Sequence, residues 1–336
     1  MKISDFDCNE KVFIIAEIGN NHEGDFSLAQ KLVEKAAEAG ADAVKFQTFI
    51  PELFVSSSDK VRMERLKKFQ LKFEEFKKLS ELAKERKLIF LSTPLDMESA
   101  IFLNEIVPAF KISSSDNTFL PLIKYIANTK KPIILSAGLT TYEEIKETRD
   151  YIYKIWNNIG VGERDLAILH CVSAYPTPHN EVNLNILNSL KRLEVTIGYS
   201  DHTMGVDAAI LSVALGARII EKHFTIDKNY SDFRDHQLSA DVQDLKIIVE
   251  KVRLAEKLLG SEEKVLQNCE RNSLPLFRRS IVSKKDLPKG TKMSFDDLAW
   301  VRPAGGISPG EEFKIIGKTT KITIPQYGLI KLEDLI

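Results

Sequence analysis

The feature that most constrains the fold of this chain is an alternation of short apolar runs with amphipathic segments. Eight runs rich in β-branched and other apolar residues lie at 12–19, 43–49, 88–94, 109–114, 132–138, 166–172, 195–200 and 218–224. They are too continuously apolar for half-exposed strands and are typical of parallel strands covered on both faces. Segments with helical spacing lie between them, as at 27–40 and 142–158. This alternation over about 260 residues predicts an α/β fold, a (β/α)8 TIM barrel.

The first apolar run and the end of the chain limit the alternatives. An open doubly wound sheet would usually carry a Gly-rich phosphate loop after its first strand, but this run ends in EIGNNHEG rather than GxGxxG. Residues 261–276 are largely polar, and residues 277–336 hold short apolar runs between dense turns. We therefore expect a barrel domain at 1–260, a linker at 261–276 and a small, mostly β domain at 277–336.

Composition excludes several broad classes of protein. The 47 basic and 48 acidic residues leave a net charge of −1, which argues against a general nucleic-acid or membrane binder. Three scattered cysteines form neither a disulfide framework nor a CxxC zinc motif. There is no apolar run of membrane-spanning length and no signal-peptide pattern at the polar N-terminus. These observations lead us to expect a cytoplasmic protein.

Polar side chains gather where the expected strands end, which is the edge that carries the active site in TIM barrels. Because unpaired polar groups are costly to bury, a ring of this size favours a ligand site. Its members include Glu17, Lys45, Gln47, Thr93, Lys111, Ser114, Ser136, Ser173, Tyr175, His202 and His223.

Lys45 and Lys111 lie within the second and fourth expected strands. Each could bind phosphate or carboxylate as a point charge, form a Schiff base as an aldolase lysine does, or pair with a barrel carboxylate such as Glu17. The neighbouring hydroxyl residues favour anion binding.

Two of the six histidines, His202 and His223, end adjacent expected strands. Two such imidazoles can share one divalent metal and leave positions open for substrate and water. They could equally be hydrogen-bonded to other groups. His170 lies inside a strand run, and we expect it to be a core residue.

Several motifs together resemble the sialic acid synthase family, whose members make nonulosonic acids from phosphoenolpyruvate and an N-acylated hexose. They span almost the whole chain: AEIGNNHEGD (16–25), VKFQTF (44–49), STP (92–94), KISSSD (111–116), KPIILSAG (131–138), HCVSAYPTP (170–178), IGYSDHT (197–203), EKHFT (221–225) and DHQLS (235–239). The segment from FRRSIVSKKDLPKG to WVRP resembles the antifreeze-like (SAF) domain of the same enzymes.

The resemblance implies a role for each matching position. His202 and His223 match the metal ligands, which usually hold Mn²⁺ or a similar ion such as Mg²⁺. Glu17 matches an essential carboxylate and, with Tyr175 and Asp235, is a candidate catalytic residue. The positions that match phosphoenolpyruvate contacts are Lys45, Thr93, Lys111, Ser114 and Ser173, and those that face the amino-sugar are Gln47, Tyr175, Asp235 and Arg302.

Arg302 belongs to the SAF domain, and the resemblance implies that this domain delivers it into the active site of a partner subunit. The expected assembly is therefore a domain-swapped homodimer. The expected reaction is a metal-dependent, C–C bond-forming transfer that yields a sialic-acid-like nonulosonic acid and phosphate.

Two departures leave the sugar substrate open. Ser173 stands where sialic-acid-forming members often have Asn, and Phe233 and Arg234 replace the Gly and Pro of a PGPDH loop. The acceptor could be N-acetylmannosamine or a diacetamido-trideoxyhexose, as in legionaminate or pseudaminate synthesis. A Schiff-base sugar aldolase and a non-catalytic carbohydrate-binding protein are the alternatives outside the family.

Overall fold

The computed structural model describes residues 1–161 and 165–336, which divide into two compact units, Met1–Gly260 and Ser261–Ile336. The division falls where the sequence turns from amphipathic to polar, at the end of the expected barrel. Each unit has its own apolar core, so each is described by itself.

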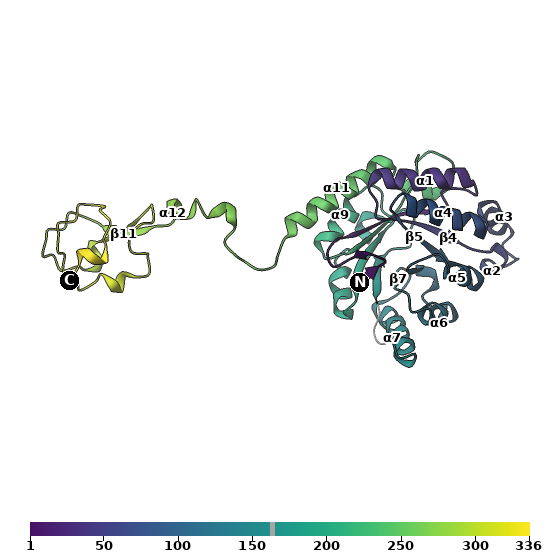
Figure 1. Cartoon of the computed structure of the whole chain (residues 1–336), viewed down its shortest axis with the longest axis horizontal. Coiled ribbons are helices and arrows are strands. Elements are labelled where there is room, and N and C mark those ends of the chain that lie inside the picture. Colours follow the sequence, from purple (N-terminus) through teal and green to yellow (C-terminus); the bar gives the residue numbers. More distant parts are fainter. Residues whose placement is uncertain (162–164) are drawn as a thin grey trace. The chain divides into compact units, whose positions relative to one another are not determined.

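Within the described part of the first unit, eight parallel strands form a nearly closed barrel, as the apolar runs predict (Figure 1). Their hydrogen-bonded order is β5-β4-β3-β10-β9-β8-β7-β6. The strands are β3 (Phe13–Gly19), β4 (Ala43–Thr48), β5 (Ile89–Pro94), β6 (Phe110–Ile112), β7 (Ile133–Ser136), β8 (Leu166–Cys171), β9 (Thr196–Asp201) and β10 (Ile219–His223). All eight lie within the predicted runs or one residue beyond them.

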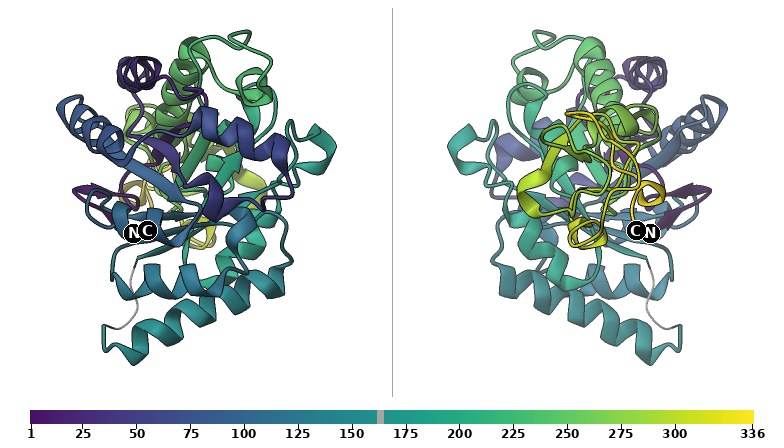
Figure 2. Two further views of the ribbon diagram at one scale, coloured as in Figure 1. Left: turned by 90° about the vertical axis from the view of Figure 1, so that its right-hand side faces the viewer. Right: turned by 90° about the vertical axis from the view of Figure 1, so that its left-hand side faces the viewer.

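Helices surround these strands, as both views in Figure 2 show. They are α1 (Phe26–Ala39), α2 (Pro51–Phe54), α3 (Lys60–Phe69), α4 (Phe73–Glu85), α5 (Met97–Leu103), α6 (Leu120–Asn128), α7 (Tyr142–Asn158), α8 (Ile186–Leu190), α9 (Asp207–Ala214), α10 (Arg234–Leu238) and α11 (Val242–Leu259). The signals in the sequence act as expected on α1: Asp25 caps its first backbone amides, and Gly40 ends it with a φ of +88°. None of the described helices is long and apolar enough to cross a membrane.

The core of the barrel unit consists of two apolar layers. The larger one lies between strands and helices and includes the buried Phe46, Phe110 and Trp156. The smaller one fills the barrel at the end where the strands begin, and the N-terminal hairpin of β1 (Lys2–Ile3) and β2 (Phe6–Asp7) packs against it. Because that end is filled by apolar side chains, the polar residues are left at the opposite end, where the strands finish.

The second unit contains α12 (Leu274–Phe277) and an antiparallel pair, β11 (Ser280–Ser283) with β12 (Leu298–Val301). Isolated bridges such as Leu287 to Ile324 hold its irregular backbone together. The core is small and aliphatic, with Ile281, Ile315 and Ile330 fully buried. This agrees with a small β domain made largely of turns.

Candidate active site

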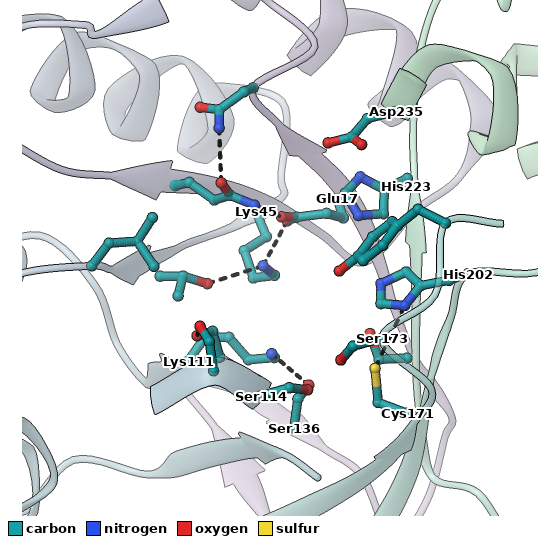
Figure 3. Close-up of a pocket in the computed structure, with 18 of the residues that line it drawn as sticks. Glu17, Lys45, Lys111, Ser114, Ser136, Cys171, Ser173, His202, His223 and Asp235 are labelled. Carbon is teal, nitrogen blue, oxygen red and sulfur yellow. Dashed lines mark hydrogen bonds and ion pairs between the residues drawn. The ribbon is translucent and has the colours of Figure 1, made fainter. Parts of the chain in front are cut away.

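A cavity of about 360 Å³ opens at the ends of the barrel strands. Eleven of the twelve site residues predicted from the sequence line it, and Figure 3 shows most of them pointing toward one another. They are Glu17, Lys45, Gln47, Thr93, Lys111, Ser114, Ser173, Tyr175, His202, His223 and Asp235. The twelfth, Arg302, lies exposed in the second unit, with its guanidinium 5.8 Å from the Phe277 ring. Its predicted place in an active site stays a prediction.

The floor of the cavity is built of hydroxyl groups around Lys111. Lys111 Nζ donates to Ser136 Oγ at 2.6 Å, and the Gly138 amide donates to Ser114 Oγ at 3.0 Å. A Cβ on Gly138 would come within 2.4 Å of Ser173 Oγ and 2.8 Å of Ser114 Oγ, so any other residue there would displace both hydroxyls from the cavity. The close approach brings the backbone amide and the two serine hydroxyls together with the ammonium group. Such a cluster can bind a phosphate or carboxylate.

Lys45 is held between two buried carboxylates. Its Nζ lies 2.7 Å from Glu17 Oε2 and 3.7 Å from Glu221 Oε2, and it donates to Thr93 Oγ1 at 3.0 Å. Glu221 Oε1 lies 3.6 Å from Lys111 Nζ and accepts a hydrogen bond from Ser200 Oγ. Two cations and two carboxylates thus alternate through the site, and the pairing of Lys45 with Glu17 is one of the alternatives open from the sequence.

The two carboxylates titrate in opposite directions. Burial raises the pKa of Glu17 to about 7, against the opposing effect of Lys45 and with a contribution from Glu221. Burial also disfavours the charge on Glu221, but Lys111 and Lys45 outweigh it and hold its pKa well below the usual range. Glu221 is therefore a permanent anion, whereas Glu17 can exchange a proton near neutral pH.

Burial lowers the pKa of Lys111, since Glu221 only partly offsets the cost of an enclosed charge. For Lys45, Glu17 and Glu221 outweigh burial and raise the pKa. Lys45 therefore keeps its proton and has no free amine for nucleophilic attack.

His202 and His223 lie along one wall, with ring centroids 5.5 Å apart (Figure 3). His202 Nδ1 lies 2.8 Å from the Val172 carbonyl, so a proton on Nδ1 would leave Nε2 free as a ligand. Burial and the neighbouring cations lower the pKa of His223 well below its usual value, and its Nδ1 has no hydrogen-bond partner in the described residues. A neutral imidazole with an unused nitrogen suits metal binding.

These two rings fit a metal that keeps open coordination positions. Within residues 1–161 and 165–336, no group of three or more His, Cys, Asp or Glu side chains is arranged as a metal site. Two protein ligands would leave the remaining positions to substrate and water, as the sequence suggests.

The side chains expected to face the amino-sugar line the same cavity as these rings. The centroid of the Tyr175 ring lies 4.2 Å from that of the His202 ring. The guanidinium carbon of Arg234 lies over the Tyr175 ring, 4.9 Å from its centroid. Gln47 Oε1 accepts a hydrogen bond from Asn20, and burial raises the pKa of Asp235. These groups offer hydrogen bonds to a hydroxylated ligand. His170 Nε2 lies 2.6 Å from the Val182 carbonyl oxygen, to which it donates when it carries the proton, and the side chain is buried, as expected of a core residue.

Glu221 was assigned no role from the sequence, although it lies in the centre of the charge network. The signal that could have found it is spacing, since it precedes His223 by two residues and therefore shares a strand face with it. One face of α3 also lines the cavity, a position that the charged run 60–68 did not predict.

Comparison with known proteins identifies the family. The NeuB family model matches residues 32–264, and the SAF domain model matches residues 278–335. The chain belongs to the NeuB family. Both the expected resemblance and the barrel followed by a SAF domain are thereby confirmed.

Relatives of this NeuB protein are named synthases of three nonulosonic acids. The N,N'-diacetyllegionaminic acid synthase of Campylobacter jejuni is 40% identical, over 92% of this chain and 96% of its own length. A pseudaminic acid synthase of the same species is 36% identical over 99% of both chains. The structure of N-acetylneuraminic acid synthetase from Leptospira borgpetersenii, in complex with citrate, is 33% identical, covers 81% of this chain and 94% of its own, and has a TM-score of 0.76. The expectation of a synthase that condenses phosphoenolpyruvate with a sugar is confirmed at family level.

Proposed function

We propose that this NeuB protein condenses phosphoenolpyruvate with an N-acylated hexose, either N-acetylmannosamine or a diacetamido-trideoxyhexose. The products are a sialic-acid-like nonulosonic acid and phosphate. The observation that carries the proposal is the buried floor, where Lys45 and Lys111, each 3% exposed, meet serine and threonine hydroxyls. Such a floor suits a small ligand with two anionic groups, because enclosed ammonium groups bind anions far more strongly than exposed ones.

The proposed phosphoenolpyruvate site is made of Lys45, Thr93, Lys111, Ser114 and Ser173. In this proposal the hydroxyls and lysines exchange their present hydrogen bonds with one another for bonds to phosphate and carboxylate oxygens. A hydrogen bond from a lysine ammonium to an anionic oxygen is stronger than the same bond to a neutral hydroxyl, because both partners are then charged.

His202 and His223 would hold a divalent cation, Mn²⁺ or Mg²⁺. When bound, it supplies Lewis-acid polarisation of the sugar aldehyde. The support is the spacing of the two rings and the unpartnered nitrogen of His223. Gln47, Tyr175 and Asp235 line the same cavity and would orient the open-chain sugar with its aldehyde carbon toward the floor.

The bond changes follow from this arrangement. C3 of phosphoenolpyruvate forms a bond to the aldehyde carbon, and the aldehyde oxygen becomes an alkoxide. Water captures the cation left at C2 and loses a proton to Glu17, which passes that proton to the alkoxide and is ionised again. The tetrahedral C2 then expels phosphate by cleavage of its C–O bond as its hydroxyl becomes the ketone, and the leaving phosphate takes the hydroxyl proton. Lys45 and Lys111 stabilise the anionic groups throughout.

The experiment that tests the proposal is phosphate release from phosphoenolpyruvate in the presence of Mn²⁺ and a panel of N-acyl hexoses. We expect release that needs both an acceptor sugar and the metal, and its loss in excess chelator. Absence of release with every acceptor would contradict the function, and full activity in chelator would contradict the metal. A lysine adduct trapped by borohydride would instead favour the aldolase. The raised pKa of Lys45 disfavours Lys45 as its nucleophile, so Lys111, whose pKa is lowered, is the lysine that such an adduct would identify.

The proposed functional unit is a homodimer in which the SAF domain of one subunit supplies Arg302 to the other. The support is the match of WVRP to the SAF motif and the exposure of Arg302 within its own domain. A guanidinium with no acidic partner in the described residues is available to bind the N-acyl carbonyl.

A further inference from the structure

One side of the cavity is apolar, in contrast to its charged floor. The residues of this apolar wall belong to one packed cluster and also line the cavity: Phe54, Leu66, Phe69, Leu95 and Phe233. Leu66, Phe69 and Leu95 are less than a tenth exposed, whereas Phe54 and Phe233 are half-buried. The wall is therefore anchored in the protein and still presents aromatic surface to the cavity.

Local structure explains why the wall faces the site. Residues 62, 65, 66 and 69 recur at helical spacing, so one face of α3 presents all four to the cavity. Phe69 then packs edge-on against Phe233, with ring centroids 5.1 Å apart, and this contact joins α3 to the segment before α10. Arg62 stacks on Phe54 at 5.0 Å, which puts guanidinium donors at the edge of the apolar surface.

The wall has a consequence for the sugar that binds there. A hydroxyl group placed against apolar side chains loses its hydrogen bonds to water and gains none in return. A methyl group at the same place gains from burial. In the proposed function the floor binds the anionic groups of phosphoenolpyruvate, and the aldehyde of the sugar lies beside His202 and His223. The end of the open-chain sugar that is remote from the aldehyde therefore contacts the apolar wall.

We propose that the apolar wall selects a deoxy acceptor, a diacetamido-trideoxyhexose whose C6 is a methyl group, over N-acetylmannosamine. The methyl groups at C6 and on the second N-acyl group contact the wall, and the second acyl carbonyl accepts a hydrogen bond at its edge from Arg62. This inference rests on the proposed function and narrows its substrate class. It also assigns a role to Phe233, which lines the cavity and packs against Phe69.

The test compares three acceptors with the same protein and saturating phosphoenolpyruvate and Mn²⁺: N-acetylmannosamine, its 6-deoxy analogue and a 2,4-diacetamido-2,4,6-trideoxyhexose. We expect kcat/KM for the trideoxy sugar to exceed that for N-acetylmannosamine about 100-fold, because a hydrophobic pocket discriminates by roughly 10- to 200-fold per group. The 6-deoxy analogue should fall between them. Equal or better use of N-acetylmannosamine would overturn the inference.

Variants of the wall separate its contribution from general effects. Phe233→Ala and Phe54→Ala should reduce the preference for the trideoxy sugar about tenfold, through KM for the sugar, with KM for phosphoenolpyruvate unchanged. Phe73→Ala is the matched control, since Phe73 is half-buried and stacks on Phe102 at 4.1 Å outside the cavity. A preference unchanged in both wall variants would contradict the inference. Failure of every acceptor to release phosphate would instead contradict the proposed function.

Discussion

At the scale of single residues, Glu17 and Glu221 show how position decides the chemistry of the same side chain. Both are almost fully buried, but Glu221 has two lysines and a serine hydroxyl around it, whereas Glu17 shares Lys45 with Glu221. The pKa of Glu17 is consequently raised to about 7, and that of Glu221 is lowered. Only Glu17 changes its charge in the pH range where the protein would act.

This difference predicts the pH dependence of the reaction. If ionised Glu17 accepts a proton from water, kcat/KM should rise with pH through an inflection near 7, the pKa of Glu17 in the free protein. Glu17→Gln should remove the inflection and lower kcat by about 10²- to 10⁴-fold. The measurement is kcat/KM for phosphate release across neutral pH. Retention of the inflection in Glu17→Gln would assign it to another group, and Glu17→Asp serves as the conservative variant.

At the scale of elements, β9 and β10 are joined by an ion pair that is buried behind the site. Lys222 Nζ lies 2.9 Å from Asp201 Oδ2 and also donates a hydrogen bond to the Thr203 carbonyl oxygen. Asp201 Oδ1 accepts a hydrogen bond from the Thr203 backbone amide. Asp201 and Lys222 directly precede His202 and His223, so the pair cross-links the two strand ends that carry the histidines. Neither side chain is more than 1% exposed.

Lys222→Met should therefore weaken the proposed metal binding as well as stability. Breaking one partner of a buried pair costs about 3–5 kcal/mol, because the other charge stays uncompensated. Misplaced histidines should lower Mn²⁺ affinity by about 10- to 100-fold, as supporting residues of metal sites typically do. Titration calorimetry with Mn²⁺ and thermal unfolding measure the two effects.

The control for this variant is Arg253→Met. It breaks the ion pair of Arg253 with Asp42, 2.6 Å long, which lies outside the cavity lining. It should lower stability and leave Mn²⁺ affinity unchanged. An equal loss of Mn²⁺ affinity in Lys222→Met and Arg253→Met would show that the Asp201–Lys222 pair acts only on stability and does not position the histidines.

The position of helix α3 could not be predicted from its charge pattern. The charged run 60–68 is helical, as its composition allows, and most of its cations are exposed. Its apolar residues Leu66 and Phe69 nevertheless dock it beside the strand ends, and this docking turns Arg62 and Arg65 toward the cavity. The charge pattern predicts which side chains of a helix are exposed to solvent, but it does not predict which other elements the helix packs against.

At the scale of the whole molecule, the chain is two compact units, and the proposed site is complete only if the SAF domain of a partner subunit supplies Arg302. Arg302→Ala should raise KM for the sugar by about 10-fold or more and leave KM for phosphoenolpyruvate nearly unchanged, since a hydrogen bond to a charged group contributes about 1.5–3 kcal/mol. Steady-state kinetics with each substrate varied measures the two constants. An equal effect on both would contradict contact with the N-acyl group.

Complementation decides whether Arg302 acts within its own subunit or across a dimer. If it acts across the dimer, co-expressed Glu17→Gln and Arg302→Ala chains form heterodimers with one intact site. At sugar concentrations far below KM, the mixture should then reach about a quarter of wild-type activity, above the residual activity of Arg302→Ala alone. If it acts within its own chain, no intact site forms and the activity of the mixture does not exceed that residual level. That result would contradict the domain-swapped homodimer.

Much of the fold and of the site was predictable from the sequence, for an identifiable reason. A strand of a parallel barrel is covered on both faces, which leaves a continuous apolar run, and all strands end at one edge. Polar residues far apart in the chain, such as Glu17, Lys111 and His223, could therefore be assigned to one place. Spacing alone left open whether Lys45 and Lys111 form a Schiff base or bind an anion. The motif resemblance then favoured the anion site.

By itself, the sequence determined the eight-stranded barrel, the following SAF domain and the residues that meet at the strand ends. Only the tertiary structure decided which lysine pairs with which carboxylate, why Glu17 and Glu221 titrate in opposite directions, and that an apolar wall from α3 and Phe233 closes one side of the cavity. The physical reason is the distance over which each signal operates. Hydrophobic periodicity reflects residues that are near neighbours in the chain, whereas ionic and packing interactions depend on distances in space that only folding sets.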